Sequence, residues 1–219
     1  QKVSADIPQN FDCGLTDEQL TQIRLQMDAA GVQMPVCFYA TIPGDEAGCR
    51  KVFEFGRKMG IETFISEPPP EALDVIERCC DEYDIRLAIH NHGPDQSPVY
   101  WRPEGVLEVC QGRSKRIGAC PDTGYWIRSG IDPIQGLRTL GDRVITIQAH
   151  DVHELSPDAH DVPWGTGKAD FAQLMQELVR LNIRPTLFDL EYSYDFEDNM
   201  AEMQECIRFY EQVISELAR

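Results

Sequence analysis

The stretch TFISEPPPEALDVIERCCDEYDIRLAIHNH, residues 63–92, decides the fold class. It opens with a short run of β-branched and aromatic residues, Thr63–Ser66, which three prolines end before the next segment begins. The apolar residues of that segment recur on one helical face: Leu73, Ile76, Cys80 and Tyr83. A second strand follows at Arg86–Ile89. The stretch therefore reads as one strand–helix–strand unit, which is typical of a parallel sheet.

The same alternation continues in both directions along the 219 residues. We expect six strands, at Val36–Ile42, Thr63–Ser66, Arg86–Ile89, Ile117–Cys120, Val144–Ala149 and Thr186–Leu190. Segments with helical periodicity fill the intervals, and no linker rich in proline or serine divides the chain. The sequence predicts a single α/β domain over residues 1–219, since one barrel commonly holds up to about 250 residues.

The composition narrows the classes of partner. The chain carries 20 Lys and Arg against 37 Asp and Glu, so its formal net charge is −17. An acidic protein repels phosphate backbones and anionic lipids, which argues against nucleic acid and membranes as partners. No run approaches the ~18 apolar residues of a membrane span.

The eight cysteines form no CxxC pair, and we expect buried free thiols rather than a disulfide framework.

Side chains that can bind metals follow five consecutive strands, at the point where each strand ends. They are Glu67, His90, His92, Asp122, Gln148, His150, Asp151 and Glu191. Because the ends of parallel strands gather around one axis in such folds, these groups can converge. Mixed oxygen and imidazole ligands suit Mn²⁺, Mg²⁺, Co²⁺ or Zn²⁺, and the lack of thiolates argues against a structural zinc site. One divalent metal ion is the expected cofactor.

Five motifs carry a family resemblance. They are AIHNHG (Ala88–Gly93), GACPDTGYWIRSGIDP (Gly118–Pro133), GDRVITIQAHD (Gly141–Asp151), VPWGTGKAD (Val162–Asp170) and LFDLEYS (Leu187–Ser193). Together they resemble the sugar phosphate isomerase/epimerase proteins, which have a xylose-isomerase-like TIM barrel. The resemblance implies a (β/α) barrel with one divalent cation, and by position it implies four ligands: His90, Asp122, Gln148 and Glu191.

Two motifs depart from the family pattern, at three positions. Tyr125 stands where the family has a histidine, Gln148 stands at the usual ligand histidine, and His150 stands at the usual lysine. A Gln148 carbonyl oxygen can ligate Mg²⁺ or Mn²⁺. Alternate strand residues face the same side, so His150 is an alternative ligand or acid/base, and His153 is a further candidate.

The resemblance also leaves the first βα unit and the second strand of the barrel without a counterpart. We therefore expect a TIM-type barrel that is incomplete, with about six strands. An open barrel leaves unpaired backbone groups at its edge. Residues 1–14 or a second copy in a homo-oligomer would cover that edge, and a fragment of a longer chain is the other interpretation. The expected location is cytoplasmic, with a removed leader left open because the chain begins at Gln1.

The expected substrate is a small carbohydrate. Aromatic rings cover the apolar side of a sugar, and a guanidinium matches planar oxygens. The substrate-binding candidates are His92, Trp101, Arg102, Trp126, Arg128 and Trp164. A metal ion polarises a carbonyl, and a neighbouring group then moves the adjacent proton. The candidates for proton transfer are Glu191, Glu67 and His150.

These features predict a sugar isomerase or epimerase that depends on a divalent metal. Three alternatives stay open. A lyase or hydratase acting on 3-keto-glycosides would begin with the same proton abstraction. A carbohydrate-binding barrel without catalysis would agree with Gln148 and Tyr125. An abasic-site endonuclease shares the barrel, but it requires a basic groove, which the net charge of −17 opposes.

Overall fold

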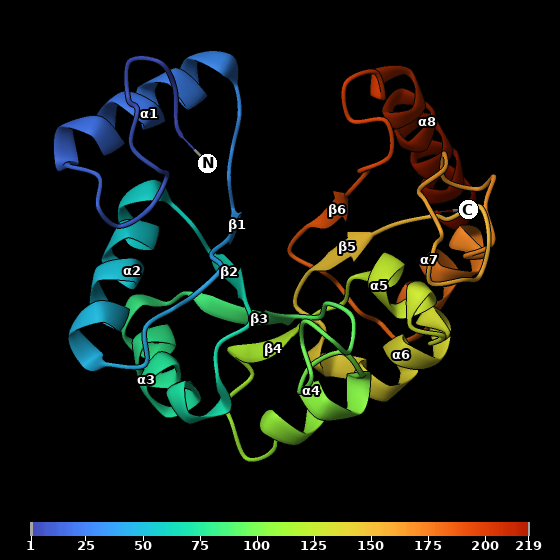
Figure 1. Ribbon diagram of the computed structural model, residues 1–219, viewed down its shortest axis with the longest axis horizontal. Helices are drawn as coiled ribbons and strands as arrows, with labels where there is room; N and C mark the ends of the chain where they lie inside the picture. Colours follow the sequence, from blue (N-terminus) through green and yellow to red (C-terminus); the bar gives the residue numbers. More distant parts are fainter. Residues whose placement is uncertain (1, 219) are drawn as a thin grey trace. The chain divides into compact units, whose positions relative to one another are not determined.

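A computed structural model describes residues 2–218, and its helices and strands alternate along most of the chain (Figure 1). The chain divides into two compact units. The first unit runs to Ala88 and includes Arg113–Ile117, and the second contains Ile89–Gly112 and the chain from Gly118 onward.

The first unit is built from βα segments that the sequence predicts. Its elements are α1 (Asp17–Ala30), β1 (Val36–Phe38), α2 (Glu46–Met59), β2 (Thr63–Ser66), a 3₁₀ turn at Pro70–Ala72, α3 (Leu73–Tyr83) and the start of β3 (Arg86–His90). The strands β1 and β2 are parallel, with Val36 opposite Thr63. A reciprocal capping box begins α1, because the Thr16 side chain accepts from Gln19 N and the Gln19 side chain accepts from Thr16 N.

The second unit holds the remaining elements. They are α4 (Pro103–Val109), most of β4 (Ile117–Cys120), α5 (Thr123–Arg128), α6 (Pro133–Leu140), a 3₁₀ turn at Gly141–Arg143, β5 (Ile147–Ala149), α7 (Phe171–Arg180), β6 (Phe188–Leu190) and α8 (Met200–Leu217). The strands β5 and β6 are parallel, and a parallel bridge joins Asp122, just past β4, to Gln148 of β5. The carboxyl ends of β4, β5 and β6 therefore lie next to one another.

The strands of the described residues form a four-stranded sheet in the order β1-β2-β3-β4 and a two-stranded sheet of β5 and β6. The prediction of a parallel α/β fold is confirmed, although several strands are shorter than expected. The predicted strand Val36–Ile42 ends at Phe38, and the predicted strand Val144–Ala149 begins at Ile147. The single-domain prediction stays a prediction.

Buried aromatic side chains pack each unit. In the first unit the rings of Phe53 and Phe64 meet edge to face with their centroids 5.5 Å apart. In the second unit Trp164 stacks on Phe171 at 4.3 Å. All eight cysteines are free and seven of them are buried, as expected from their apolar surroundings. Among residues 2–218, no helix has the length and apolar character needed to cross a membrane.

Candidate metal centre

Asp122 is fixed by the elements on both sides of it. It follows β4 and is the N-cap of α5, where its Oδ1 accepts a hydrogen bond from Tyr125 N at 2.8 Å. The Asn91 side chain holds its backbone, accepting from Asp122 N at 3.0 Å and donating to Asp122 O at 3.1 Å. Its second oxygen, Oδ2, is buried and has no hydrogen-bond partner in the described part of the chain. One carboxylate oxygen thus caps a helix while the other is left for a ligand.

His150 is held in a similar way after β5. Its backbone N donates to Thr123 Oγ1 at 2.8 Å, and its ring Nδ1 lies 2.8 Å from Asp161 Oδ1. The other ring nitrogen, Nε2, lies 3.4 Å from Asp122 Oδ2 and 3.8 Å from Glu191 Oε2. This nitrogen is buried and, within residues 2–218, also lacks a hydrogen-bond partner. Asp122, His150 and Glu191 therefore each offer one ligand atom, with all three atoms within 4.8 Å of one another.

Asp161 anchors the outer side of this cluster and is only 1% exposed. Its Oδ1 accepts from His150 Nδ1 and, at 3.0 Å, from Arg128 Nη2. Its Oδ2 accepts from the backbone N of Ser193 at 2.8 Å and from the hydroxyl of Ser193 at 2.7 Å. Four donors thus surround a single buried carboxylate.

The charged side chains of the cluster shift one another's pKa values toward the charged forms. Burial would raise the pKa of Asp122, but His150 and His90 outweigh it and hold that pKa well below its usual range. Burial would lower the pKa of His150, but Asp122, Asp161 and Glu191 raise it well above the ordinary value. The pKa of Asp161 is depressed despite burial, because His150 and Ser193 hydrogen-bond to its carboxylate. The two aspartates are therefore anionic at neutral pH.

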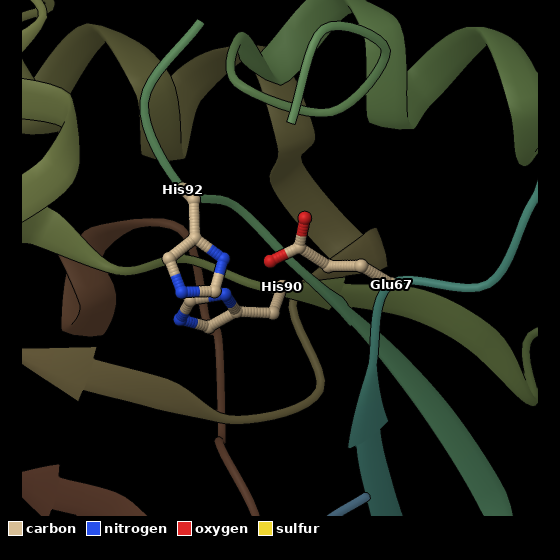
Figure 2. Close-up of side chains that lie close together, drawn as sticks. All are labelled: Glu67, His90 and His92. Atoms are coloured by element: carbon tan, nitrogen blue, oxygen red, sulfur yellow. The ribbon is translucent and has the colours of Figure 1, made fainter. Parts of the chain in front are cut away.

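His90 and His92 lie at the end of β3, beside this cluster. His90 Nε2 is 3.5 Å from Asp122 Oδ2. The imidazole rings of His90 and His92 lie close together (Figure 2), with centroids 4.5 Å apart, and the Tyr125 ring is 4.7 Å from that of His92. Glu67, labelled in the same view, follows β2 and belongs to the first unit.

Gln148 lies in β5 opposite Asp189 of β6. Its side-chain oxygen is 3.8 Å from Cys120 Sγ, which donates to it. The Gln148 side chain also hydrogen-bonds to Asp189 and opposes the rise that burial causes in the pKa of Asp189. These partners lie on the strands next to β5, whereas His150 Nε2 lies among the carboxylates. Metal ligation by Gln148 and by His150 both stay predictions, and of the two side chains His150 is the one whose nitrogen lies within 4.8 Å of the ligand atoms of Asp122 and Glu191.

The predicted sugar-binding side chains lie in different surroundings. Trp126 and Trp164 are buried: a Cβ on Gly136 would lie 2.5 Å from the Trp126 ring, and Trp164 packs on Phe171. Both tryptophan rings therefore take part in the interior packing of the second unit.

The remaining members of that set differ in exposure and partners. Arg102 is exposed, and its guanidinium lies over the half-buried Trp101 ring at 4.9 Å. Arg128 pairs with Asp161 and donates through Nε to Ala159 O at 2.9 Å. His92 lies beside Tyr125. Of the six residues, His92, Trp101 and Arg102 keep some exposed surface without being committed to the interior or to Asp161.

The long loop after β5 is organised by Asp151. Its two carboxylate oxygens accept four backbone N–H groups, those of Val152, Gly165, Gly167 and Ala169, at 2.9 to 3.0 Å. A Cβ at Gly167 would lie 2.2 Å from Asp151 Oδ1, so only glycine permits this approach. The Gly-Thr-Gly sequence is therefore explained by a turn around Asp151. The same loop contains Asp161 and places its carboxylate next to His150.

Asp161 was not among the candidates that the sequence suggested, because it lies in the middle of this loop and not at a strand end. The one signal that could have found it is its position in the His-Asp pair just before the VPWGTGKAD motif, in a loop too long for a simple connection.

Parallel βα segments with a cluster of carboxylates and imidazoles at the strand ends define the class: an α/β protein with a candidate cation centre. The profile of the xylose isomerase-like TIM barrel family matches residues 6–212, and the chain belongs to this family. The resemblance seen in the motifs, and the TIM-type fold that it implied, are thereby confirmed.

Several solved structures are similar to this chain. An uncharacterised protein from Parabacteroides distasonis ATCC 8503 is 29% identical, with a TM-score of 0.72 over 97% of this chain and 84% of that one. A D-tagatose 3-epimerase-like protein is 17% identical, with a TM-score of 0.72 over 92% and 86%. The 3-keto-D-glucoside 4-epimerase from E. coli is 12% identical, with a TM-score of 0.66 over 89% and 88%. Among curated proteins no match was found.

Proposed function

We propose that this protein is an isomerase or epimerase that depends on a divalent metal and moves a proton next to a carbonyl of a sugar or keto-sugar. The observation that carries the proposal is a pair of buried atoms, Asp122 Oδ2 and His150 Nε2, that lack a hydrogen bond within residues 2–218 and lie 3.4 Å apart beside Glu191. Membership of the xylose isomerase-like family supports it, as do structural neighbours that are sugar epimerases.

The donor set fits a cation. A buried acceptor without a partner costs free energy, and a metal ion satisfies such an atom better than an uncharged group does. Asp122, His150 and Glu191 would supply two oxygen ligands and one nitrogen ligand, and His90 is near enough to Asp122 to add a second nitrogen. This mixture suits Mn²⁺, Co²⁺ or Zn²⁺, and Mg²⁺ more weakly.

The chain's own residues would divide the work as follows. The bound cation would supply a Lewis acid that polarises the substrate carbonyl. The Glu191 side chain is 41% exposed, so it reaches solvent and can take up a proton from the carbon next to that carbonyl. Asp122 and His150 are almost fully buried, so they would hold the cation and fix its position. Glu67 remains a predicted second carboxylate for proton transfer, and homo-oligomer formation and a cytoplasmic location remain predictions as well.

Metal analysis tests the site. Asp122→Asn keeps a good N-cap but weakens the ligand, so we expect the wild type to retain close to one divalent ion after reconstitution and dialysis and the variant to lose it. Glu191→Gln should lose most of the ion as well. Asp170→Asn is the matched control, because Asp170 also caps a helix in this unit but lies outside the cluster. A wild type that retains less than a tenth of an equivalent would refute the proposal.

The reaction itself is tested in deuterated water. The metal-loaded protein is incubated with free ketoses and, separately, with 3-keto-glycosides. Deuterium incorporation next to the carbonyl without bond cleavage supports an isomerase or epimerase. Cleavage of the glycoside identifies the alternative lyase or hydratase. Binding of the sugar with neither outcome identifies a carbohydrate-binding barrel and overturns the enzymatic proposal.

A further inference from the structure

We infer that Asp161 is the positioning residue of this centre. It orients the His150 ring directly, and by its hydrogen bonds to Ser193 it fixes the segment in which Glu191 lies. The inference rests on the proposed function, because it assigns a role toward the metal ligands. It concerns a residue in the middle of a loop, outside the set of strand-end residues.

The first contact determines which nitrogen of His150 is available. Asp161 Oδ1 lies 2.8 Å from Nδ1, and a carboxylate there can only accept, so Nδ1 carries the hydrogen. When His150 gives up its second proton to bind a metal ion, the lone pair of Nε2 lies on the side of Asp122 and Glu191. Histidines that bind metals commonly have such a partner on the opposite ring nitrogen, which fixes both the tautomer and the ring orientation.

The second contact reaches the end of β6. Asp161 Oδ2 accepts both the backbone N–H and the hydroxyl of Ser193, which follows Glu191 by two residues. The hydroxyl of Tyr192, the residue between them, donates to Glu202 Oε2 at 2.5 Å and lies 3.4 Å from the backbone oxygen of Asp161. Two hydrogen bonds therefore tie Ser193 to Asp161, and they restrict where the Glu191 side chain begins.

The chemistry of the four donors makes the site specific for a carboxylate. His150 Nδ1, Arg128 Nη2, Ser193 N and Ser193 Oγ all donate to Asp161. An asparagine has nearly the same shape, but its NH₂ group would face two donors in either orientation. Asp161→Asn therefore removes hydrogen bonds on one side whichever way the amide turns.

Nuclear magnetic resonance of protein labelled with ¹⁵N-histidine measures the first contact. We expect a slowly exchanging, low-field proton signal on His150 Nδ1, assigned by its absence in His150→Gln, both before and after zinc is added. In Asp161→Asn this signal disappears. The matched control is Asp158→Asn, which removes a negative charge from the same loop at an exposed position and should leave the signal unchanged.

Zinc affinity measures the consequence. Loss of such a supporting partner commonly weakens metal binding by about 10- to 100-fold, and we expect this for Asp161→Asn but not for Asp158→Asn. Ser193→Ala keeps the backbone N–H, so it should fold and weaken zinc binding by a smaller factor. This variant keeps the test decisive if Asp161→Asn does not fold.

The outcomes separate the two proposals. If Asp161→Asn and Ser193→Ala bind zinc as the wild type does, or if the His150 signal survives in Asp161→Asn, the positioning role is refuted. If the wild type binds no metal, the proposed function fails, and the His150 signal in the metal-free protein still reports whether Asp161 orients the ring.

Discussion

Ion pairs of similar length occupy opposite environments in the two units. On the helices of the first unit, Glu46 pairs with Arg50 at 2.9 Å and with Arg78 at 3.1 Å, and these side chains are 39 to 61% exposed. In the second unit, Arg128 pairs with Asp161 at 3.0 Å, and the aspartate side chain is 1% exposed. The N···O distances are similar in the two kinds of ion pair, but the exposed fractions of the side chains differ.

The comparison teaches that burial, and not contact distance, decides what an ion pair does. Exposed charges remain hydrated and are screened by salt, so pairing them adds little stability. A buried carboxylate depends on its partners, because without them it would be an uncompensated charge. The ion pairs of Glu46 belong to a solvated helix surface of the first unit, whereas the pair of Arg128 and Asp161 holds a candidate centre in the second unit.

The largest expected effect comes from breaking the buried pair. Arg128→Met should lower the free energy of unfolding by about 3 kcal/mol, because removing one partner of a buried ion pair typically costs ~3–5 kcal/mol and His150 still pairs with Asp161. Urea unfolding of the metal-free protein measures the change. Arg50→Met is the control and should leave the midpoint nearly unchanged. Equal shifts of the urea midpoint in the two variants would show that burial does not make the Arg128 ion pair more important for stability than the Arg50 ion pair.

A pH series gives an intermediate effect. Hydrogen bonds from Arg180 and Arg138 lower the pKa of Glu177 to about 2 from its ordinary value of 4.5. Since the folded pKa is the lower one, the stabilisation is present above pH 4.5 and is lost as the pH falls toward 2.

The Glu177 side chain is 6% exposed, against 45% for Glu46. Glu177→Gln should therefore flatten the acid decline of the urea midpoint more than Glu46→Gln does. The same decline in the wild type and in Glu177→Gln would show that this pair does not contribute.

The smallest effect concerns two helix caps. Asp45 caps α2 by accepting from Gly48 N at 2.9 Å, as Asp122 caps α5. Asp45→Ala should cost about 1 kcal/mol of unfolding free energy, and Asp45→Asn almost nothing. Neither variant should change metal retention, which inductively coupled plasma analysis measures. Loss of the ion in Asp45→Asn would contradict the assignment of the centre to the second unit.

Much of the fold could be predicted because it depends on periodicity. The six strands and the capping box of α1 follow from local patterns, and the structure has them at nearly the expected places. The bounds of β5 could not be predicted, because Val144 continues the apolar run and yet forms only an isolated bridge with Ala119. The helix α5 was also missed, since its six residues are too few to display a helical period.

The candidate site was predictable only where strand ends determine it. Asp122, His150 and Glu191 were found because each follows a strand, and the structure brings them together. The choice between Gln148 and His150 could not be made from sequence, because strand residues two apart face the same side. Asp161 could not be found by that rule, since a hydrogen bond across the loop, and not the sheet, brings it to His150.

The hydrogen bonds that Asp151 accepts from its own loop have a consequence for protein engineering. The ends of the loop are fastened by four N–H groups to one carboxylate and by the bridge between Val152 and Asp161. The tip at residues 153–158 lies beyond these fastenings and is mostly exposed. Because lengthening a flexible loop costs only about 0.6 kcal/mol per doubling, a peptide tag inserted at the tip should leave His150 and Asp161 undisturbed. The loop is thus a natural point of attachment for a label or a tether.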